Sequence, residues 1–145
     1  MRLLFMVVTC VQFCIAGFPS SSRLLAARPS VSIDGLANRE SPFACDRLAL
    51  TPSARSRHFD ELGPQLRAIK TGVRELPNGY AFQFPADMKS VQLVAEWAAG
   101  ERSCCPFFDI TIRLEPEGGP MWLTMTGRQG TKQFIEADAP AWLKQ

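Results

Sequence analysis

Apolar residues recur every three or four positions from residue 51 to residue 71, which predicts an amphipathic helix. Thr51 is a suitable N-cap, and Pro52 fits the first helical position. The predicted inner face consists of Arg55, Phe59, Leu62, Leu66 and Ile69. Gly63 and Pro64 interrupt this segment. Because proline lacks an N–H and its ring crowds the preceding turn, we expect the helix to kink or to split there.

A strict alternation follows and indicates β-structure. Tyr80, Phe82 and Phe84 alternate with Ala81 and Gln83, which predicts a strand with one aromatic face. The preceding Pro77-Asn78-Gly79 is typical of a turn, with Gly79 at positive φ. Residues 73–84 are therefore predicted to form a β-hairpin.

The clearest helical pattern begins after Asp87, which is a good N-cap. Its predicted apolar face is formed by Met88, Val91, Val94, Ala95 and Ala98. The helix is expected to end at Cys104, because Pro106 disfavours helical geometry at Cys105.

Two further alternating segments, 109–115 and 120–127, are joined by a short Gly- and Pro-rich link and predict a second antiparallel hairpin. A short helix over 131–137 follows. The predicted order is α-ββ-α-ββ-α. This order indicates an α+β fold, in which a small antiparallel sheet of two hairpins has helices packed on one face.

The N-terminal part of the chain differs from the rest in composition. Residues 1–27 contain Arg2 and an apolar run from Leu3 to Phe18, too short for a spanning helix but typical of a signal peptide. Residues 28–41 are expected to be an unstructured spacer, and residues 42–145 a single α+β domain. A real signal peptide implies an exported or periplasmic protein. If the start codon lies too far upstream, the protein is instead cytoplasmic.

The charge balance argues against two classes of partner. The chain has 16 Lys and Arg against 14 Asp and Glu, and removing residues 1–27 takes away Arg2 and Arg23, leaving 14 against 14. The charges are scattered singly along the predicted domain. Neither a nucleic acid nor an anionic membrane surface is therefore expected as a partner.

Three cysteines remain after the signal-like segment: Cys45, Cys104 and Cys105. Cys104 and Cys105 are adjacent at a helix-to-strand junction, and Cys45 lies 59 residues upstream, within possible reach in a compact domain. Thiolates select soft ions, so mercury, arsenite and copper(I) are the expected guests of a site that these residues would form. His58 is the single histidine and could add a fourth ligand, although a lone helical histidine is more often at or near the surface.

Two alternatives to metal binding remain open. Free cysteines are often inert, buried, small hydrophobic residues, which would make this a structural or interaction domain. A thiol-based enzyme is the third hypothesis and is not favoured. The pair lies at a helix C-terminus, where the dipole is negative, and Glu101 adds negative charge, so a lowered thiol pKa is not expected. No other catalytic motif is apparent.

The helix that ends in Glu-Arg-Ser-Cys-Cys-Pro-Phe is preceded by LPNGYAFQFPAD and followed by GPMWLTMTG. In these segments the chain resembles a family of small, largely uncharacterised bacterial proteins with a Glu-Arg-x-Cys-Cys-Pro-Phe signature. The resemblance runs from Cys45 to about Ala137. It implies the domain boundaries and a bacterial source, and it carries no activity. The long N-terminal segment and the Gly63-Pro64 interruption depart from the family pattern.

Overall fold

The computed structural model of the protein describes residues 40–144, which belong to one compact unit. The predicted signal-like segment 1–27 lies outside the described residues, as does the predicted spacer 28–41 except for its last two positions. Export therefore stays a prediction. Within residues 40–144, no helix has both the length and the apolar character needed to cross a bilayer.

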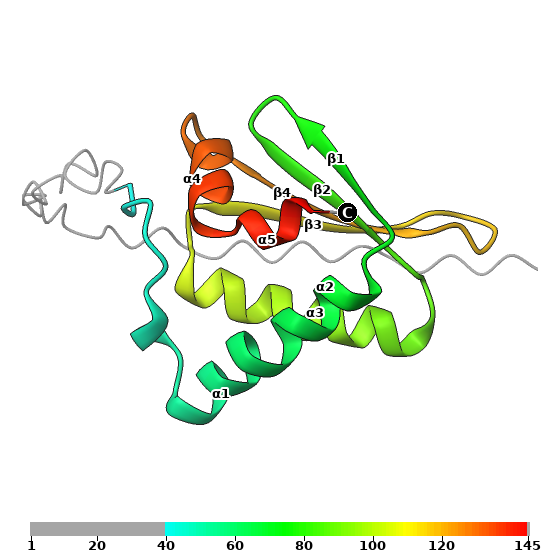
Figure 1. The fold of residues 1–145 in the computed structure, drawn as a ribbon, viewed down its shortest axis with the longest axis horizontal. Coiled ribbons are helices and arrows are strands. Elements are labelled where there is room, and N and C mark those ends of the chain that lie inside the picture. The colour runs from blue at the N-terminus through cyan, green and yellow to red at the C-terminus, as the bar shows by residue number, and fades with distance from the viewer. Residues whose placement is uncertain (1–39, 145) are drawn as a thin grey trace, which may run out of the picture. The chain divides into compact units, whose positions relative to one another are not determined.

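The described residues form an α+β fold, as predicted (Figure 1). Four antiparallel strands make one sheet in the order β1-β2-β4-β3, so the two predicted hairpins pair through their second strands. The strands are β1 (Gly72–Leu76), β2 (Gly79–Phe84), β3 (Phe108–Leu114) and β4 (Met121–Gly127). The helices are the short η2 (Arg47–Ala49), α1 (Pro52–Ser56), the π-helix η3 (Arg57–Leu62), α2 (Gly63–Ile69), α3 (Met88–Cys104), α4 (Thr131–Asp138) and α5 (Pro140–Leu143). Of these, η2 and α5 were not predicted.

The main core lies between one face of the sheet and the helices. Tyr80 is opposite Met125, and Phe82 is opposite Leu123, so the large side chains of the two central strands share one face. The buried helix residues that pack in the same core are Leu62, Leu66, Val94, Trp97, Ala98, Ile135 and Trp142. Burial of these side chains positions α3 across the sheet and brings its C-terminal end to the edge of the core.

The first helical segment changes from a π-helix to an α-helix at Gly63, where a kink or a split was expected. Thr51 caps it as predicted, accepting a hydrogen bond from the N–H of Ala54. The chain does not split at Pro64: residues Arg57–Leu62 form a π-helix that leads directly into α2, and the N–H of Gly63 bonds to the carbonyl of His58. The wider turn, in which bonds reach five residues back, carries the chain past a proline that has no N–H to donate.

The expected positive φ at Gly79 is wrong. Among the described glycines, the positive φ angles occur at Gly118 and Gly130. Gly79 is needed for a different reason: a Cβ built on it would lie 2.0 Å from the backbone oxygen of Met125 on the neighbouring strand. Close approach of β2 to β4, rather than turn geometry, therefore selects glycine here.

The predicted inner face of α3 was only partly right. Val94 and Ala98 are buried, but Met88 is 78% exposed. The buried positions of α3 are Ser90, Val94, Trp97, Ala98, Glu101 and Cys104. Two of these are polar, and they would not be chosen from a hydrophobic pattern. Burial of a carboxylate near the helix end points to a specialised environment there.

Candidate metal centre

The end of α3 places the two adjacent cysteines in the protein interior. The helix ends at Cys104 as predicted, and Cys105 leaves helical geometry with φ −128° and ψ 65°. Both side chains are buried, at 0% and 2% exposed. Their sulfurs lie 3.8 Å apart, far longer than the roughly 2.05 Å of a disulfide, and both are free thiols.

Cys45 joins this pair from the segment before η2. The backbone N–H of Asp46 donates to the carbonyl of Cys104 over 2.8 Å, which ties the segment to the end of α3. The bond also satisfies one of the carbonyls that a helix end leaves without a partner. The sulfurs of Cys45, Cys104 and Cys105 all lie within 4.8 Å of one another. Cys45, which the sequence placed only within possible reach of the pair, thus lies beside it.

His58 and Glu101 form a second group beside the sulfurs. The Nε2 atom of His58 lies 3.1 Å from Oε1 of Glu101, and both residues are buried. Candidate ligand atoms of His58, Glu101 and Cys104 also lie within 4.8 Å of one another, so Cys104 belongs to both groups. The lone histidine is thus an interior residue, contrary to the usual position of such residues. Its ring stacks on Trp97, with centroids 5.5 Å apart.

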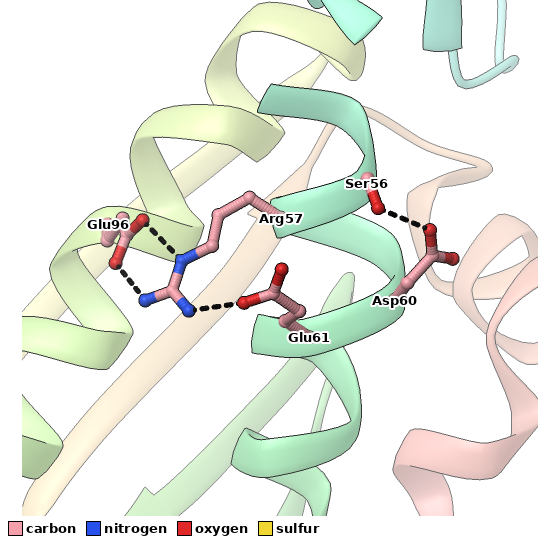
Figure 2. Close-up of polar contacts among 5 residues, drawn as sticks. All are labelled: Ser56, Arg57, Asp60, Glu61 and Glu96. Carbon is pink, nitrogen blue, oxygen red and sulfur yellow. Dashed lines mark hydrogen bonds and ion pairs between the residues drawn. The ribbon is translucent and has the colours of Figure 1, made fainter. Parts of the chain in front are cut away.

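The outer side of the π-helix is fixed to α3 by charged residues (Figure 2). The guanidinium of Arg57 donates to both carboxylate oxygens of Glu96, each over 2.9 Å, and to Glu61 over 2.8 Å. Exposed ion pairs of this kind add little to stability. Their consequence is positional: Arg57 adjoins His58 in the chain, so the bidentate contact holds the π-helix where the histidine ring meets α3.

The three cysteine thiols differ in pKa. Hydrogen bonds with Cys105 and His58 lower the pKa of Cys104 to about 4, although burial alone would raise it. Burial raises the pKa of Cys45 to about 12, and the neighbouring Cys104 raises that of Cys105 well above its ordinary value. The expectation that no thiol here has a lowered pKa is therefore wrong, because the helix-dipole argument included neither the contact of Cys104 with Cys105 nor its contact with His58.

The pKa of His58 gives a prediction for stability. Burial lowers it, but hydrogen bonds with Cys104 and Glu101 outweigh burial and raise the pKa from 6.5 to about 9. A raised pKa stabilises the fold fully below pH 6.5, and this contribution is lost as the pH rises through about 9. We expect the difference in unfolding free energy between the native protein and His58→Gln, measured by urea denaturation, to shrink over that range. A difference independent of pH would contradict this.

Gly100 has a structural role at this site that can be tested with a matched pair of substitutions. A Cβ on Gly100 would lie 2.4 Å from Nδ1 of His58, whereas on Gly63 the nearest atom is the flexible end of Arg67, 3.3 Å away. Alanine normally improves a helix over glycine by about 1 kcal/mol. We expect Gly63→Ala to be neutral or stabilising and Gly100→Ala to lower the unfolding free energy by about 1–3 kcal/mol. Equal effects in chemical denaturation would show that His58 does not pack against Gly100.

A cavity of about 360 Å³ adjoins the cysteines. Cys45, Cys105, His58 and Glu101 contribute to its wall, and Cys104 does not. The remaining walls come mainly from aromatic residues of the core and from the α4–α5 junction, including Phe82, Trp97, Phe108, Phe134, Asp138, Ala139, Pro140 and Trp142.

No protein-family model, curated protein or solved structure matches the chain. The resemblance of its Cys-Cys-Pro-Phe segment to a bacterial family therefore stays a prediction. What this site can do follows from its own geometry and chemistry. Sequence reasoning proposed the three cysteines, but it missed Glu101 as a buried neighbour. The spacing of Trp97, Glu101 and Cys104, four and three residues apart, would have placed all three on one helical face.

Proposed function

We propose that the protein binds a soft metalloid ion, trivalent arsenic presented as arsenite, through Cys45, Cys104 and Cys105. The observation that carries the proposal is the convergence of three free thiols, from segments 59 residues apart, to within 4.8 Å of one another. Thiolate ligands select thiophilic ions over magnesium or calcium. Mercury(II) and copper(I) are the other ions that suit such a set.

Charge favours arsenite among these three ions. Arsenous acid, As(OH)₃, exchanges each As–O bond for an As–S bond, and each hydroxyl leaves as water after taking up one proton. Cys45 and Cys105 supply two of these protons as thiols, and solvent supplies the third, because the lowered pKa makes Cys104 a thiolate at neutral pH. The products are a neutral trithiolate and three waters. Mercury(II) held by three thiolates carries one negative charge, and copper(I) carries two. Because Cys104 and Cys105 are buried, and an uncompensated buried charge is costly, the neutral product is favoured.

The spacing of the sulfurs also suits a common central atom. Two sulfurs bound to one atom at about 2.3 Å, the length of a zinc–thiolate bond, lie roughly 3.5–4 Å apart when the angle is near tetrahedral. The sulfurs of Cys104 and Cys105 are already 3.8 Å apart. Binding would therefore require little movement of this pair.

The two alternatives account for less of the site. Cysteines that serve only as packing residues would not require the buried His58–Glu101 pair beside them, and buried ionisable groups usually cost stability relative to apolar ones. A thiol-based enzyme needs an accessible nucleophile. Cys104, the thiol whose pKa is lowered, has no exposed surface.

Alkylation of the reduced full-length protein, with and without one equivalent of arsenite, tests the proposal. We expect arsenite to protect Cys45, Cys104 and Cys105 from alkylation, as mapped on peptides after digestion, while Cys10 and Cys14 react as before. The intact mass should rise by one arsenic atom less three hydrogens. Unchanged alkylation of the three cysteines, together with an unchanged intact mass, would overturn the proposal.

A further inference from the structure

We infer that the preferred ligand of this site is an organic compound of trivalent arsenic, R–As(OH)₂, whose single aromatic substituent R occupies the cavity beside the cysteines. The inference rests on the proposed function and specifies its ligand. The cavity of about 360 Å³ is far larger than a single ion needs. A cavity of roughly 150 Å³ already holds a benzene molecule, and small-molecule sites begin at about 300 Å³.

The cavity reaches the cysteines. Cys45 and Cys105 both line it, whereas Cys104 is not among its lining residues. A monosubstituted arsenical has two exchangeable hydroxyl groups, which matches the two cysteines that line the cavity. The exchange R–As(OH)₂ + 2 thiols → R–As(SR′)₂ + 2 H₂O forms two As–S bonds and breaks two As–O bonds. The As–C bond stays intact, and no oxidant or reductant is needed.

The walls favour an aromatic substituent. Trp97 and Trp142 have ring centroids 4.7 Å apart, and Phe82 meets Trp142 edge-on at 5.4 Å. All three line the cavity. Aromatic rings prefer such offset and edge-to-face neighbours, and each pair contributes about 0.5–1.5 kcal/mol beyond area burial. A phenyl group on the arsenic would therefore gain more here than a methyl group.

Charge and access are compatible with a neutral organic ligand. Arg47 and Arg67 line the cavity together with the acidic residues Glu101 and Asp138, so its wall carries charges of both signs. Asp138 and Pro140 are exposed lining residues, while Cys105 is buried. The cavity thus leads from the surface near the α4–α5 junction to the cysteines.

Affinities of the reduced full-length protein for three probes test the inference: arsenite, methylarsonous acid and phenylarsonous acid. Competition titrations in a phosphine reductant keep external thiols from competing for arsenic. We expect the phenyl compound to bind at least about tenfold more tightly than the methyl compound, because its ring buries additional apolar surface. Ala139→Leu, which places a larger side chain in the cavity wall, should remove most of this advantage and leave arsenite binding unchanged. Ala137→Leu makes the same substitution at an exposed position outside the cavity and should preserve the advantage.

The possible failures are distinguishable. If arsenite binds but the phenyl and methyl compounds bind equally, the inference is overturned and the proposed function stands. If none of the three probes binds, both are overturned. If Ala139→Leu does not fold, the comparison of substituents on the native protein decides the matter without it.

Discussion

Replacing Cys105 by serine is expected to weaken arsenite binding by at least about a hundredfold. Loss of a residue that only supports a metal ligand typically costs 10–100-fold in affinity, and Cys105 is proposed as a ligand itself. A serine hydroxyl is a hard donor and cannot replace the soft thiolate. The remaining sulfurs, those of Cys45 and Cys104, would leave one As–OH group in a buried site. The affinity is measured by competition titration with a dithiol of known strength.

Ser103→Ala is the matched control for this experiment. Ser103 precedes the cysteines in the same helical turn, but its side chain is exposed and its hydroxyl donates to the carbonyl of Ala99. We expect this variant to bind arsenite as the native protein does. If Cys105→Ser retained native affinity and arsenite still protected Cys45 and Cys104, three-thiol coordination would be wrong. A urea denaturation curve for each variant separates loss of a ligand from loss of the fold.

The local features of the fold could be predicted because they depend on a few neighbouring residues. Thr51 and Asp87 cap their helices through side-chain bonds to nearby N–H groups. The alternation of Tyr80, Phe82 and Phe84 puts three large rings on the buried face of β2. Pro106 ends α3 at Cys104 through its effect on the residue before it. Each of these rules acts over five residues or fewer, so the sequence alone contains the information.

The composition of the site depended on contacts that no local rule describes. Cys45 is held near Cys104 by the hydrogen bond from the N–H of Asp46 to the carbonyl of Cys104, two residues that are far apart in the sequence. The burial of His58 depends on a π-helix that positions its ring against Gly100. The lowered pKa of Cys104 follows first from its contact with Cys105 and then from that histidine. The sequence could therefore identify the cysteines as candidate ligands, but it could not identify the neighbouring groups that shift their pKa values.

The order of the strands in the sheet could not be predicted from the hydrophobic alternation either. The alternation of Ile110, Ile112 and Leu114 predicts a strand with a buried face, and the strand is present as β3. It lies at the edge of the sheet, however, so Ile112 and Leu114 are exposed. The residues opposite them on β4, Leu123 and Met121, have no exposed surface. β3 and β4 thus have the same hydrophobic periodicity but unequal burial, because β3 has one neighbouring strand and β4 has two.

This difference should appear as a large contrast between two identical substitutions. Leu123 is 0% exposed on a central strand, and Leu114 is 54% exposed on the edge strand. Leu123→Ala is expected to lower the free energy of unfolding by about 2–5 kcal/mol, because it removes buried methyl groups and leaves a cavity. Leu114→Ala should change it by about 0.5 kcal/mol or less, as for other surface substitutions. Both values come from urea denaturation of the full-length variants.

The outcome bears on the site as well as on the sheet. Leu123 packs in the main core, and it does not line the cavity beside the cysteines. Where Leu123→Ala remains folded, it should therefore keep native affinity for arsenite in spite of its lower stability. Similar losses of stability in the two variants would mean that β3 is not an edge strand. A loss of arsenite affinity in the folded Leu123→Ala protein would mean that the positions of the three sulfurs depend on packing throughout the core, and not on the contacts at the end of α3.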